Sequence, residues 1–307
     1  MIYDSVLDTI GNTPLVRAQR FAKAYGAHAE LLFKLENRNP GGSAKDRVAL
    51  NMIRAAEREG RLKPGATIIE ATSGNTGIGL GLVAAILGYR VILTMPDSMS
   101  AERRKILSAF GAELVLTPGA EGMAGANARA EELLCQIPGS MRALQFENPE
   151  NPAAHEASTG PEIWRDTGGR VDALVASFGT GGTVSGAGKY LKSCDPKIRI
   201  YAVEPAESPL VSQGKAGPHG IQGIGANFVP KTLDLSIVDE FLTVTTQEAI
   251  EAARALIRTE GLFCGISSGA AALAAVRLAT RPQMGGKAIV AVLPDTAERY
   301  LSTKLFE

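Results

Sequence analysis

Short β-rich runs alternate with amphipathic helical stretches along the first part of the chain, and this rhythm constrains the fold more than any other feature. The β-rich runs cover residues 31–35, 67–69 and 91–93, and helical stretches follow them at 44–60, 75–88 and 100–111. We expect these helices to end at Gly60, Gly88 and Gly111, because a C-terminal cap needs φ > 0, which glycine adopts without strain. Such an alternation predicts βαβ units and a parallel sheet.

The rhythm pauses at Pro149 and Pro152, which we expect to interrupt both helix and strand, so we place a candidate domain boundary there. A second α/β unit follows, with strands at 173–176, 198–203 and 288–293, a helix at 182–191 and a capping box at 245–248. Residues 208–229 are rich in Gly, Pro and polar side chains and predict a long loop. A length of 307 residues also favours two domains.

Composition excludes several classes of function. The 32 Lys and Arg residues balance 32 Asp and Glu residues, so no global positive field attracts nucleic acid or an anionic membrane surface. The first eight residues include acidic side chains and no apolar core of a signal peptide, and no run is long and apolar enough to span a membrane. We therefore expect a cytoplasmic protein that acts on a small molecule, without a nucleic-acid or membrane partner.

The cysteines and histidines offer little for chemistry. The cysteines are odd in number and lack CxxC spacing, which argues against a disulfide framework or a zinc site, so we expect all three to be packing residues: Cys135, Cys194 and Cys264. The histidines are widely separated, so each is expected to be structural or solvated: His28, His155 and His219. No metal site is predicted.

Lys45 is the most informative single position. In a helix that begins near Ser43, several apolar residues share the face of Lys45, which directs its side chain toward the core: Val48, Ala49, Met52 and Ala56. Two interpretations stay open at this point. In the first, the methylene groups of Lys45 pack on apolar surface while its amine reaches solvent. In the second, the amine is desolvated and suited to forming an imine with an aldehyde.

Three polar, glycine-containing turns stand between a strand and a helix, at residues 70–77, 179–183 and 265–270. The turn at 179–183 is suited to phosphate, because backbone N–H groups and the helix dipole bind anions, although it matches neither a Walker loop nor G-x-G-x-x-G. The turn at 70–77 suits a carboxylate by the same physics. Alternatively, Ser73 or Asn75 merely caps its helix, as do the serines of the third turn. Parallel sheets gather such turns in one crevice.

Six ordered motifs resemble cysteine synthase, also called O-acetylserine sulfhydrylase, of fold type II among the pyridoxal-phosphate enzymes. They are Gly11–Val16, Gly41–Arg47, Thr72–Gly77, Gly179–Thr183, Gly223–Phe228 and Gly265–Gly269. The resemblance runs from about Asp4 to the end of the chain. It implies an α/β, tryptophan synthase β-like fold of two domains, each a mostly parallel twisted sheet covered by helices. The smaller, mobile domain would comprise residues 1–12 and 35–145, and the larger one 13–34 and 146–307.

The resemblance also implies the roles of individual residues, with pyridoxal 5'-phosphate as cofactor. Lys45 would form the internal aldimine and move protons, Asn75 would bond the ring hydroxyl, and Ser267 would face the pyridine nitrogen. The phosphate would be held by Gly179, Thr180, Gly181, Gly182 and Thr183. The substrate would be bound by Thr72, Ser73, Thr76 and Gln145 at its carboxylate, by Asn75, and by Gly225 and Ala226 at its acetyl group. A neutral serine at the ring nitrogen favours β-elimination over transamination.

The implied reaction is a β-replacement in cysteine biosynthesis. O-acetyl-L-serine would lose acetate to give an aminoacrylate, to which sulfide adds to form L-cysteine. The same resemblance implies a homodimer and a partner, the C-terminal tail of serine acetyltransferase.

Several alternatives stay open. A cystathionine β-synthase-type enzyme would condense serine with homocysteine, although the small Ala226 favours the acetylated substrate. The sequence distinguishes poorly between a cysteine synthase that uses O-acetylserine and sulfide and one that uses phosphoserine or thiosulfate. An idle scaffold is a third possibility, against which the presence of Lys45 argues. Asp295 stands where the family often has a small hydroxyl residue, and its approach to the ring nitrogen would weaken the argument from Ser267.

Overall fold

The computed structural model describes residues 2–307, which form two compact units. The first unit contains the segment that ends at Ile10 together with Lys45–Asn151, and the second contains Gly11–Ala44 and Pro152–Glu307. Each unit is built on its own mostly parallel sheet covered by helices, which confirms the predicted fold class.

The two units differ from the predicted domains mainly in residues 35–44. This segment bonds to the end of the chain: the Ala44 N–H donates to the Pro294 carbonyl oxygen (2.9 Å), and Ser43 forms an isolated β-bridge with Asp295. The predicted domains, 1–12 with 35–145 and 13–34 with 146–307, are bodies expected to move relative to each other, whereas the units are groups of residues in contact. The predicted domains therefore stay a prediction, and residue 1 lies outside the described residues.

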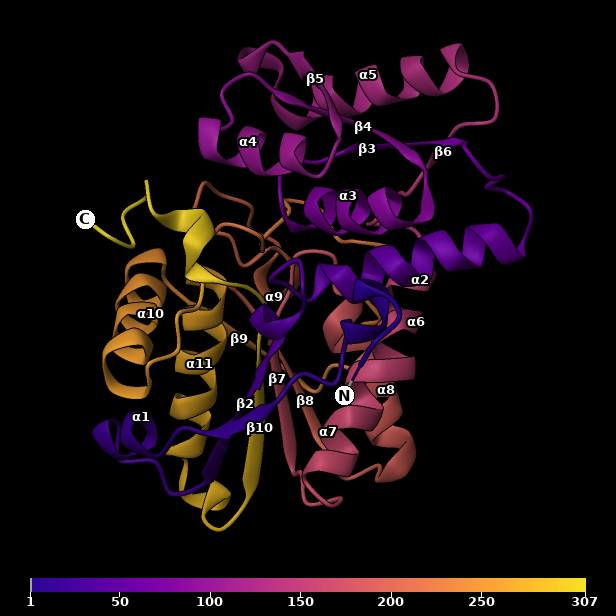
Figure 1. The fold of residues 1–307 in the computed structure, drawn as a ribbon. Helices are drawn as coiled ribbons and strands as arrows, with labels where there is room; N and C mark the ends of the chain where they lie inside the picture. The colour runs from indigo at the N-terminus through magenta and orange to yellow at the C-terminus, as the bar shows by residue number, and fades with distance from the viewer. Residues whose placement is uncertain (1) are drawn as a thin grey trace. The chain divides into compact units, whose positions relative to one another are not determined.

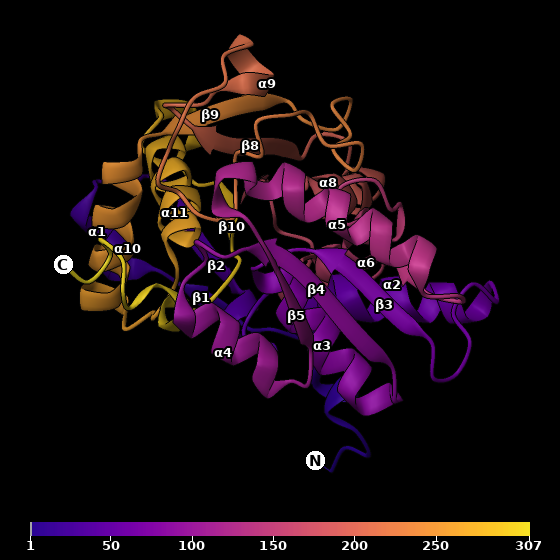
Figure 2. The ribbon, with the colours of Figure 1, turned by 90° about the horizontal axis from the view of Figure 1, so that it is seen from above.

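The first unit has four parallel strands in the order β5-β4-β3-β6. The strands are β3 (Thr67–Ala71), β4 (Arg90–Pro96), β5 (Glu113–Thr117) and β6 (Met141–Arg142). The helices are η1 (Val6–Thr9), α2 (Lys45–Arg58), α3 (Asn75–Leu87), α4 (Ala101–Ala109), η3 (Gly119–Glu121) and α5 (Gly122–Gln136). Figure 1 shows α5 on one face of the sheet and α3 and α4 on the other, with α2 packed against α3. Figure 2 shows α5 lying across β3 and β4, where apolar residues of the three elements form a core.

The second unit has six strands in the order β1-β2-β10-β7-β8-β9, of which only β1 is antiparallel to its neighbour. They are β1 (Leu15–Arg17), β2 (Glu30–Leu35), β7 (Ala173–Ser177), β8 (Arg199–Pro205), β9 (Glu240–Val244) and β10 (Ala288–Leu293). One apolar core packs α1 (Gln19–Ala24), α10 (Thr246–Glu260) and α11 (Ile266–Ala279) on one face, and another packs α7 (Gly160–Asp166) and α8 (Gly182–Cys194) on the other (Figure 1).

The remaining short elements are α6 (Glu150–Ala154), α9 (Leu210–Gln213), η2 (Glu36–Arg38), η4 (His155–Thr159), η5 (Pro282–Met284) and η6 (Ala297–Tyr300). Apart from the four residues of α9, the segment 208–229 forms no helix or strand, in agreement with the predicted loop. None of the helices between residues 2 and 307 has the length and apolar character needed to cross a membrane.

Local capping signals in the sequence are confirmed. Gly60, Gly88 and Gly111 follow α2, α3 and α4 with φ of 70°, 77° and 82°, as a left-handed C-terminal cap requires. At the start of α10, the Glu248 N–H donates to the Thr245 hydroxyl (3.3 Å), and the Thr245 N–H donates to the Glu248 carboxylate (3.0 Å). These bonds form the predicted capping box.

We expect Glu248→Gln to lower stability only near neutral pH. The Arg277 guanidinium, followed by the Thr245 N–H, lowers the pKa of Glu248 from 4.5 to about 2. Because the folded pKa lies below the unfolded one, the ionised carboxylate stabilises the fold above pH 4.5, and this contribution is lost as the pH falls toward 2. Glu248 is 37% exposed, so the effect is at most about 1 kcal/mol. The free energy of unfolding in urea should be lower for Glu248→Gln than for the wild type at pH 7, and equal for the two proteins near pH 2. The same difference at both pH values would mean that the charge of Glu248 is not the cause.

The expectation that two prolines interrupt helical structure is wrong for Pro152, whereas Pro149 lies in the turn before α6. α6 begins at Glu150, and helical structure continues through the π-helical turn η4 to the end of α7 at Asp166. Pro152 lies in the first turn of α6, where backbone N–H groups have no intrahelical partner, so the missing N–H of proline breaks no hydrogen bond.

Two of the three cysteines lie at the surface. Cys264 is buried, whereas Cys135 and Cys194 are exposed. The expectation that all three are packing residues is therefore wrong for Cys135 and Cys194, which end up on solvent-facing positions near the ends of α5 and α8.

Candidate active site

Lys45 is the first residue of α2, and its side chain is partly buried. The residues predicted to share its helical face, including Val48 and Met52, are fully buried. α2 contacts α3 closely at Gly79, where a Cβ would lie only 2.8 Å from the Lys45 carbonyl oxygen. A glycine at this position thus lets the start of α2 approach the first turns of α3.

The turn before α3 is not closed by a side-chain cap. Its N-cap is Gly74, which has no side chain to cap the first turn, and the Thr72 hydroxyl accepts only the N–H of Gly74 itself (3.3 Å), so the alternative that Ser73 or Asn75 caps the helix is wrong. The Ser73 hydroxyl instead donates to the sulfur of Met99 (2.9 Å). The first-turn N–H groups of α3 are therefore not occupied by a cap, which leaves them suited to an anion.

Gln145 joins this turn from 69 residues farther along the chain. The Thr76 hydroxyl donates to Gln145 Oε1 (2.5 Å), and both side chains are buried. The Asn151 side-chain amide donates to the Gln145 carbonyl oxygen (2.8 Å) and holds its backbone. The first unit thus brings Gln145 to the turn that contains four of the residues predicted to bind substrate, Thr72, Ser73, Asn75 and Thr76, next to the helix that begins with Lys45.

The segment Gly179–Thr183 forms a tight turn between β7 and α8. A Cβ at Gly179 would lie 2.3 Å from the Gly223 carbonyl oxygen, and one at Gly181 would lie 2.6 Å from the Leu233 Cβ. Gly181 also has φ 85° and serves as the N-cap of α8, without a side-chain cap. The Gly182 N–H donates to the Thr180 hydroxyl within the turn (3.4 Å). A turn of small residues before an N-terminus without a side-chain cap fits a phosphate group.

Gly225 and Ser267 lie at the same end of this sheet. The Gly225 N–H donates to the Phe178 carbonyl oxygen (3.3 Å), and the Ser177 hydroxyl donates to the Ser267 carbonyl oxygen (3.2 Å). Ser267 is buried in the first turn of α11, whose N-cap is Gly265, and no side chain caps this helix, so its serines are not caps. The second unit therefore gathers its predicted site residues at the carboxyl end of β7, where parallel sheets bind ligands.

His155 belongs to this group, although the sequence did not single it out. Its side chain is fully buried on the π-helical turn η4, with Nδ1 2.8 Å from the Thr159 hydroxyl and Nε2 3.1 Å from the Thr183 hydroxyl. π-helical turns are frequent at functional sites. An isolated histidine carries no motif, and only its spacing of four residues from Thr159 hinted that both side chains share one helical face.

Asp295 lies beside Gly265, the N-cap of α11. It is buried, its Oδ2 accepts a hydrogen bond from the Tyr300 hydroxyl (2.6 Å), and a Cβ at Gly265 would meet its Oδ1 at 2.2 Å. Burial, followed by the charge of Asp295, raises the pKa of the Cys264 thiol. Asp295 thus approaches the N-terminus of the helix that carries Ser267, where a negative charge is favourable.

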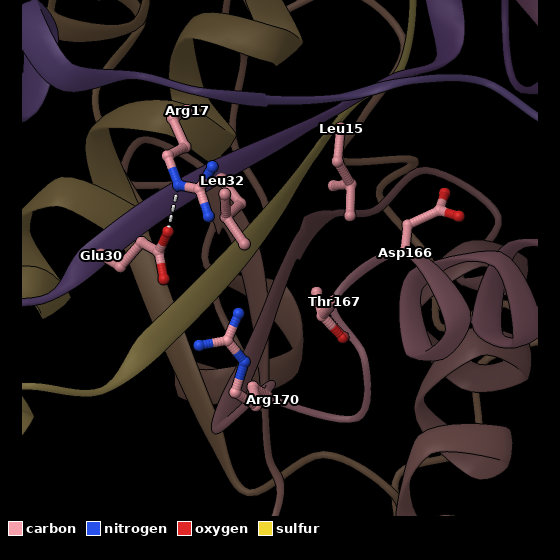
Figure 3. Close-up of a pocket in the computed structure, with 7 residues that line it drawn as sticks. All are labelled: Leu15, Arg17, Glu30, Leu32, Asp166, Thr167 and Arg170. Atoms are coloured by element: carbon pink, nitrogen blue, oxygen red, sulfur yellow. Dashed lines mark hydrogen bonds and ion pairs between the residues drawn. The ribbon is translucent and has the colours of Figure 1, made fainter.

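A separate surface pocket of about 120 Å³ lies beside β1 and β2 (Figure 3). It is lined by Leu15, Arg17, Glu30, Leu32, Asp166, Thr167 and Arg170. Arg17 and Glu30 form an ion pair across its edge. None of the residues predicted to bind cofactor or substrate lines this pocket, so it is distinct from the candidate site.

Comparison with known proteins defines the class first. Residues 6–295 match a family model described as pyridoxal-phosphate dependent enzyme. The chain is 51% identical to cysteine synthase from Haemophilus influenzae over 314 residues, which covers 100% of this chain and 98% of that protein. The chain therefore belongs to the pyridoxal-phosphate dependent enzymes and, within them, to the cysteine synthase family.

Solved structures agree with this assignment. A crystal structure of cysteine synthase from Entamoeba histolytica matches with a TM-score of 0.97 and 48% identity, and covers 100% of this chain and 91% of that one. A crystal structure of O-ureido-L-serine synthase matches with a TM-score of 0.95 and 46% identity, and covers 100% of this chain and 94% of that one.

Proposed function

We propose that this protein makes L-cysteine from O-acetyl-L-serine and sulfide, with pyridoxal 5'-phosphate as cofactor and acetate as the second product. One observation carries the proposal beyond family membership. The three helices that begin at the predicted site turns, α3, α8 and α11, each have a glycine N-cap and no side-chain cap, whereas α4 and α10 are capped by Ser100 and Thr245. Uncapped N-termini suit a substrate carboxylate and a cofactor phosphate.

The residues present fit the cofactor. Pyridoxal phosphate, when bound, supplies an electron sink that stabilises negative charge at the substrate α-carbon. We assign its phosphate to Gly179–Thr183, because bulkier side chains would fill that turn at Gly179 and Gly181. Lys45 would bind the aldehyde, Asn75 the ring hydroxyl and Ser267 the ring nitrogen.

The side chains of this protein would do the remaining work. Once the substrate amine has taken the place of Lys45 on the cofactor, the freed Lys45 Nζ would take the proton from the substrate α-carbon, and the electrons of that C–H bond would form an α,β double bond while acetate departs with the electrons of the β-carbon–oxygen bond. Hydrosulfide would then add to the β-carbon, and Lys45 would return a proton to the α-carbon to give L-cysteine. Thr72, Ser73, Asn75, Thr76 and Gln145 bind the substrate carboxylate, and Gly225 and Ala226 leave room for the acetyl group. The residues 1–12 and 35–145, as a mobile domain, would close over the substrate and exclude water.

A comparison of four substrate pairs tests this function. Purified holoenzyme is incubated separately with O-acetylserine plus sulfide, O-phosphoserine plus sulfide, O-acetylserine plus thiosulfate, and serine plus homocysteine, and the products are separated by chromatography. The small Ala226 predicts that kcat/KM for O-acetylserine with sulfide exceeds the others by at least about tenfold. Faster formation of cystathionine, or a preference for phosphoserine, would overturn the assignment.

The family resemblance supports three finer proposals. The protein would be cytoplasmic, would form a homodimer and would bind the C-terminal tail of a serine acetyltransferase. Light scattering on the purified protein measures its mass in solution. A pull-down with a peptide of the acetyltransferase tail, and with the same residues in scrambled order, tests the partner.

His155 is expected to strengthen cofactor binding through Thr183. His155→Phe keeps a ring of similar size but removes both nitrogens, so the Thr183 hydroxyl loses the partner that orients it. The dissociation constant of the cofactor, measured from its visible absorbance after dialysis, should rise about tenfold, the effect of one buried hydrogen bond. His28→Phe changes an exposed histidine and should leave this constant unchanged. If His155→Phe and His28→Phe bind the cofactor with the same dissociation constant, His155 contributes only packing.

A further inference from the structure

Glu70 places a carboxylate inside the first unit at the end of β3. Its side chain is 2% exposed, its Oε2 accepts the Leu144 N–H (2.9 Å), and its Oε1 accepts the Gln145 N–H (3.3 Å). Burial raises the pKa of Glu70, and these N–H groups together with the charge of Arg142 oppose the shift. A buried carboxylate is unfavourable unless hydrogen bonds satisfy it, so the bonds to this turn are the reason it is tolerated.

Leu144 has a strained backbone within the turn that Glu70 holds. Its φ is 53°, in the left-handed region that branched and bulky residues rarely adopt. The side chain is 39% exposed, so apolar packing does not account for this conformation. Glu70 bonds the N–H groups of Leu144 and of the next residue, and thereby fixes the peptide on both sides of the strained residue. Strain of this kind persists where surrounding contacts enforce it, often at ligand sites.

Gln145 follows directly and faces two fixed partners. Its Oε1 accepts the Thr76 hydroxyl (2.5 Å), and its carbonyl oxygen accepts the Asn151 amide (2.8 Å). Within residues 2–307, no group accepts a hydrogen bond from Gln145 Nε2. The two amide hydrogens therefore remain for a ligand, and a carboxylate provides matching acceptors.

We infer that Glu70 is a positioning residue that sets the affinity for the substrate carboxylate by holding the Leu144–Gln145 turn. The inference rests on the proposed function, because it assumes an amino-acid substrate bound at Gln145. A carboxylate is needed rather than an amide: both oxygens accept N–H groups, whereas a glutamine would turn one NH₂ donor toward a backbone N–H.

The test compares Glu70→Gln with Glu204→Gln in the holoenzyme. Glu204 is a matched control, because it is also 2% exposed and its two oxygens accept the N–H groups of Val211 (3.1 Å) and Ser212 (3.0 Å). We expect Glu70→Gln to raise KM for O-acetylserine about tenfold, the effect of losing one charge-assisted hydrogen bond, with kcat within about threefold of wild type. Glu204→Gln should change thermal stability without changing KM.

A double-mutant cycle shows whether Glu70 acts through Gln145. If it does, Glu70→Gln has little further effect on KM in a Gln145→Ala background, because the residue that it positions is gone. Leu144→Gly offers a rescue, because glycine adopts the left-handed conformation without strain, so Glu70→Gln/Leu144→Gly should recover most of the lost affinity. Should Glu70→Gln alone be insoluble, Glu70→Asp replaces it, because the shorter side chain keeps its charge but cannot reach both N–H groups, and KM should rise in that variant as well.

Distinct outcomes separate the inference from the function on which it rests. An unchanged KM in Glu70→Gln, an equal rise in Glu204→Gln, or additive effects with Gln145→Ala would each overturn the role of Glu70. A wild-type protein that forms no cysteine from O-acetylserine and sulfide would instead overturn the proposed function. A readout that does not depend on turnover is the visible absorbance of the bound cofactor, followed while O-acetylserine is added in the absence of sulfide. The O-acetylserine concentration that gives half of the absorbance change should be about tenfold higher in Glu70→Gln than in the wild type.

Discussion

Lys45→Ala is expected to lower the rate of cysteine formation by at least about 10³-fold, the largest effect of any single substitution in this chain. The substitution removes both the amine that binds the cofactor aldehyde and the base that takes the substrate α-proton. Rates are measured with O-acetylserine and sulfide, and the visible absorbance of the purified variant reports whether the cofactor environment changes as well.

Lys189→Ala is the matched control for this loss. Lys189 lies on α8 with its side chain 60% exposed and forms a surface ion pair with Glu156 (2.9 Å). Surface pairs of this kind contribute little to stability, so this variant should keep the wild-type rate. A Lys45→Ala protein that retained both its turnover and its absorbance would show that another group binds the cofactor and does the chemistry.

Gly181→Ala is expected to have the second-largest effect, on cofactor affinity. Alanine is strained at φ 85°, and its Cβ would lie 2.6 Å from the Leu233 Cβ, so the turn must move. A displaced turn misaligns the N–H groups proposed to hold the phosphate. We expect the dissociation constant of the cofactor to rise about 10- to 100-fold, in line with the strain of a left-handed alanine together with the overpacking.

The control for this variant lies seven residues, or about two turns, farther along, within α8. A Cβ at Gly188 would meet the Ile237 Cγ2 at 2.8 Å, a comparable clash away from the phosphate turn. Gly188→Ala should therefore lower the melting temperature and leave cofactor affinity unchanged. Equal losses of affinity in the two variants would indicate general destabilisation, and the assignment of the phosphate to Gly179–Thr183 would then lose its support.

The sequence was sufficient for the elements whose causes are local. Gly60, Gly88 and Gly111 mark helix ends because the left-handed cap depends on a single residue, and the Thr245 capping box depends on four consecutive residues. The prediction for Pro152 was wrong because a proline breaks a helix only beyond its first turn, and Pro152 is the third residue of α6, which begins at Glu150.

The candidate site was harder to predict from the sequence, because its contacts join distant segments. Thr76 meets Gln145 across 69 residues, and Glu70 meets the same turn across 74 and 75 residues. No periodicity encodes such pairs. The family resemblance supplied the role of Gln145, whereas Glu70 and His155 became visible only through their burial and their hydrogen bonds. Conversely, uncapped glycine turns were recognisable from the sequence as anion sites, although capping by Ser73 or Asn75 had to be excluded by the structure.

The account depends most on the covalent attachment of the cofactor to Lys45. Reduction of the holoenzyme with borohydride, followed by proteolysis and mass spectrometry, identifies the attached lysine directly. We predict one pyridoxyl phosphate group, on the peptide that contains Lys45. Attachment to a different lysine, or a fully loaded protein with no modified lysine, would contradict the account.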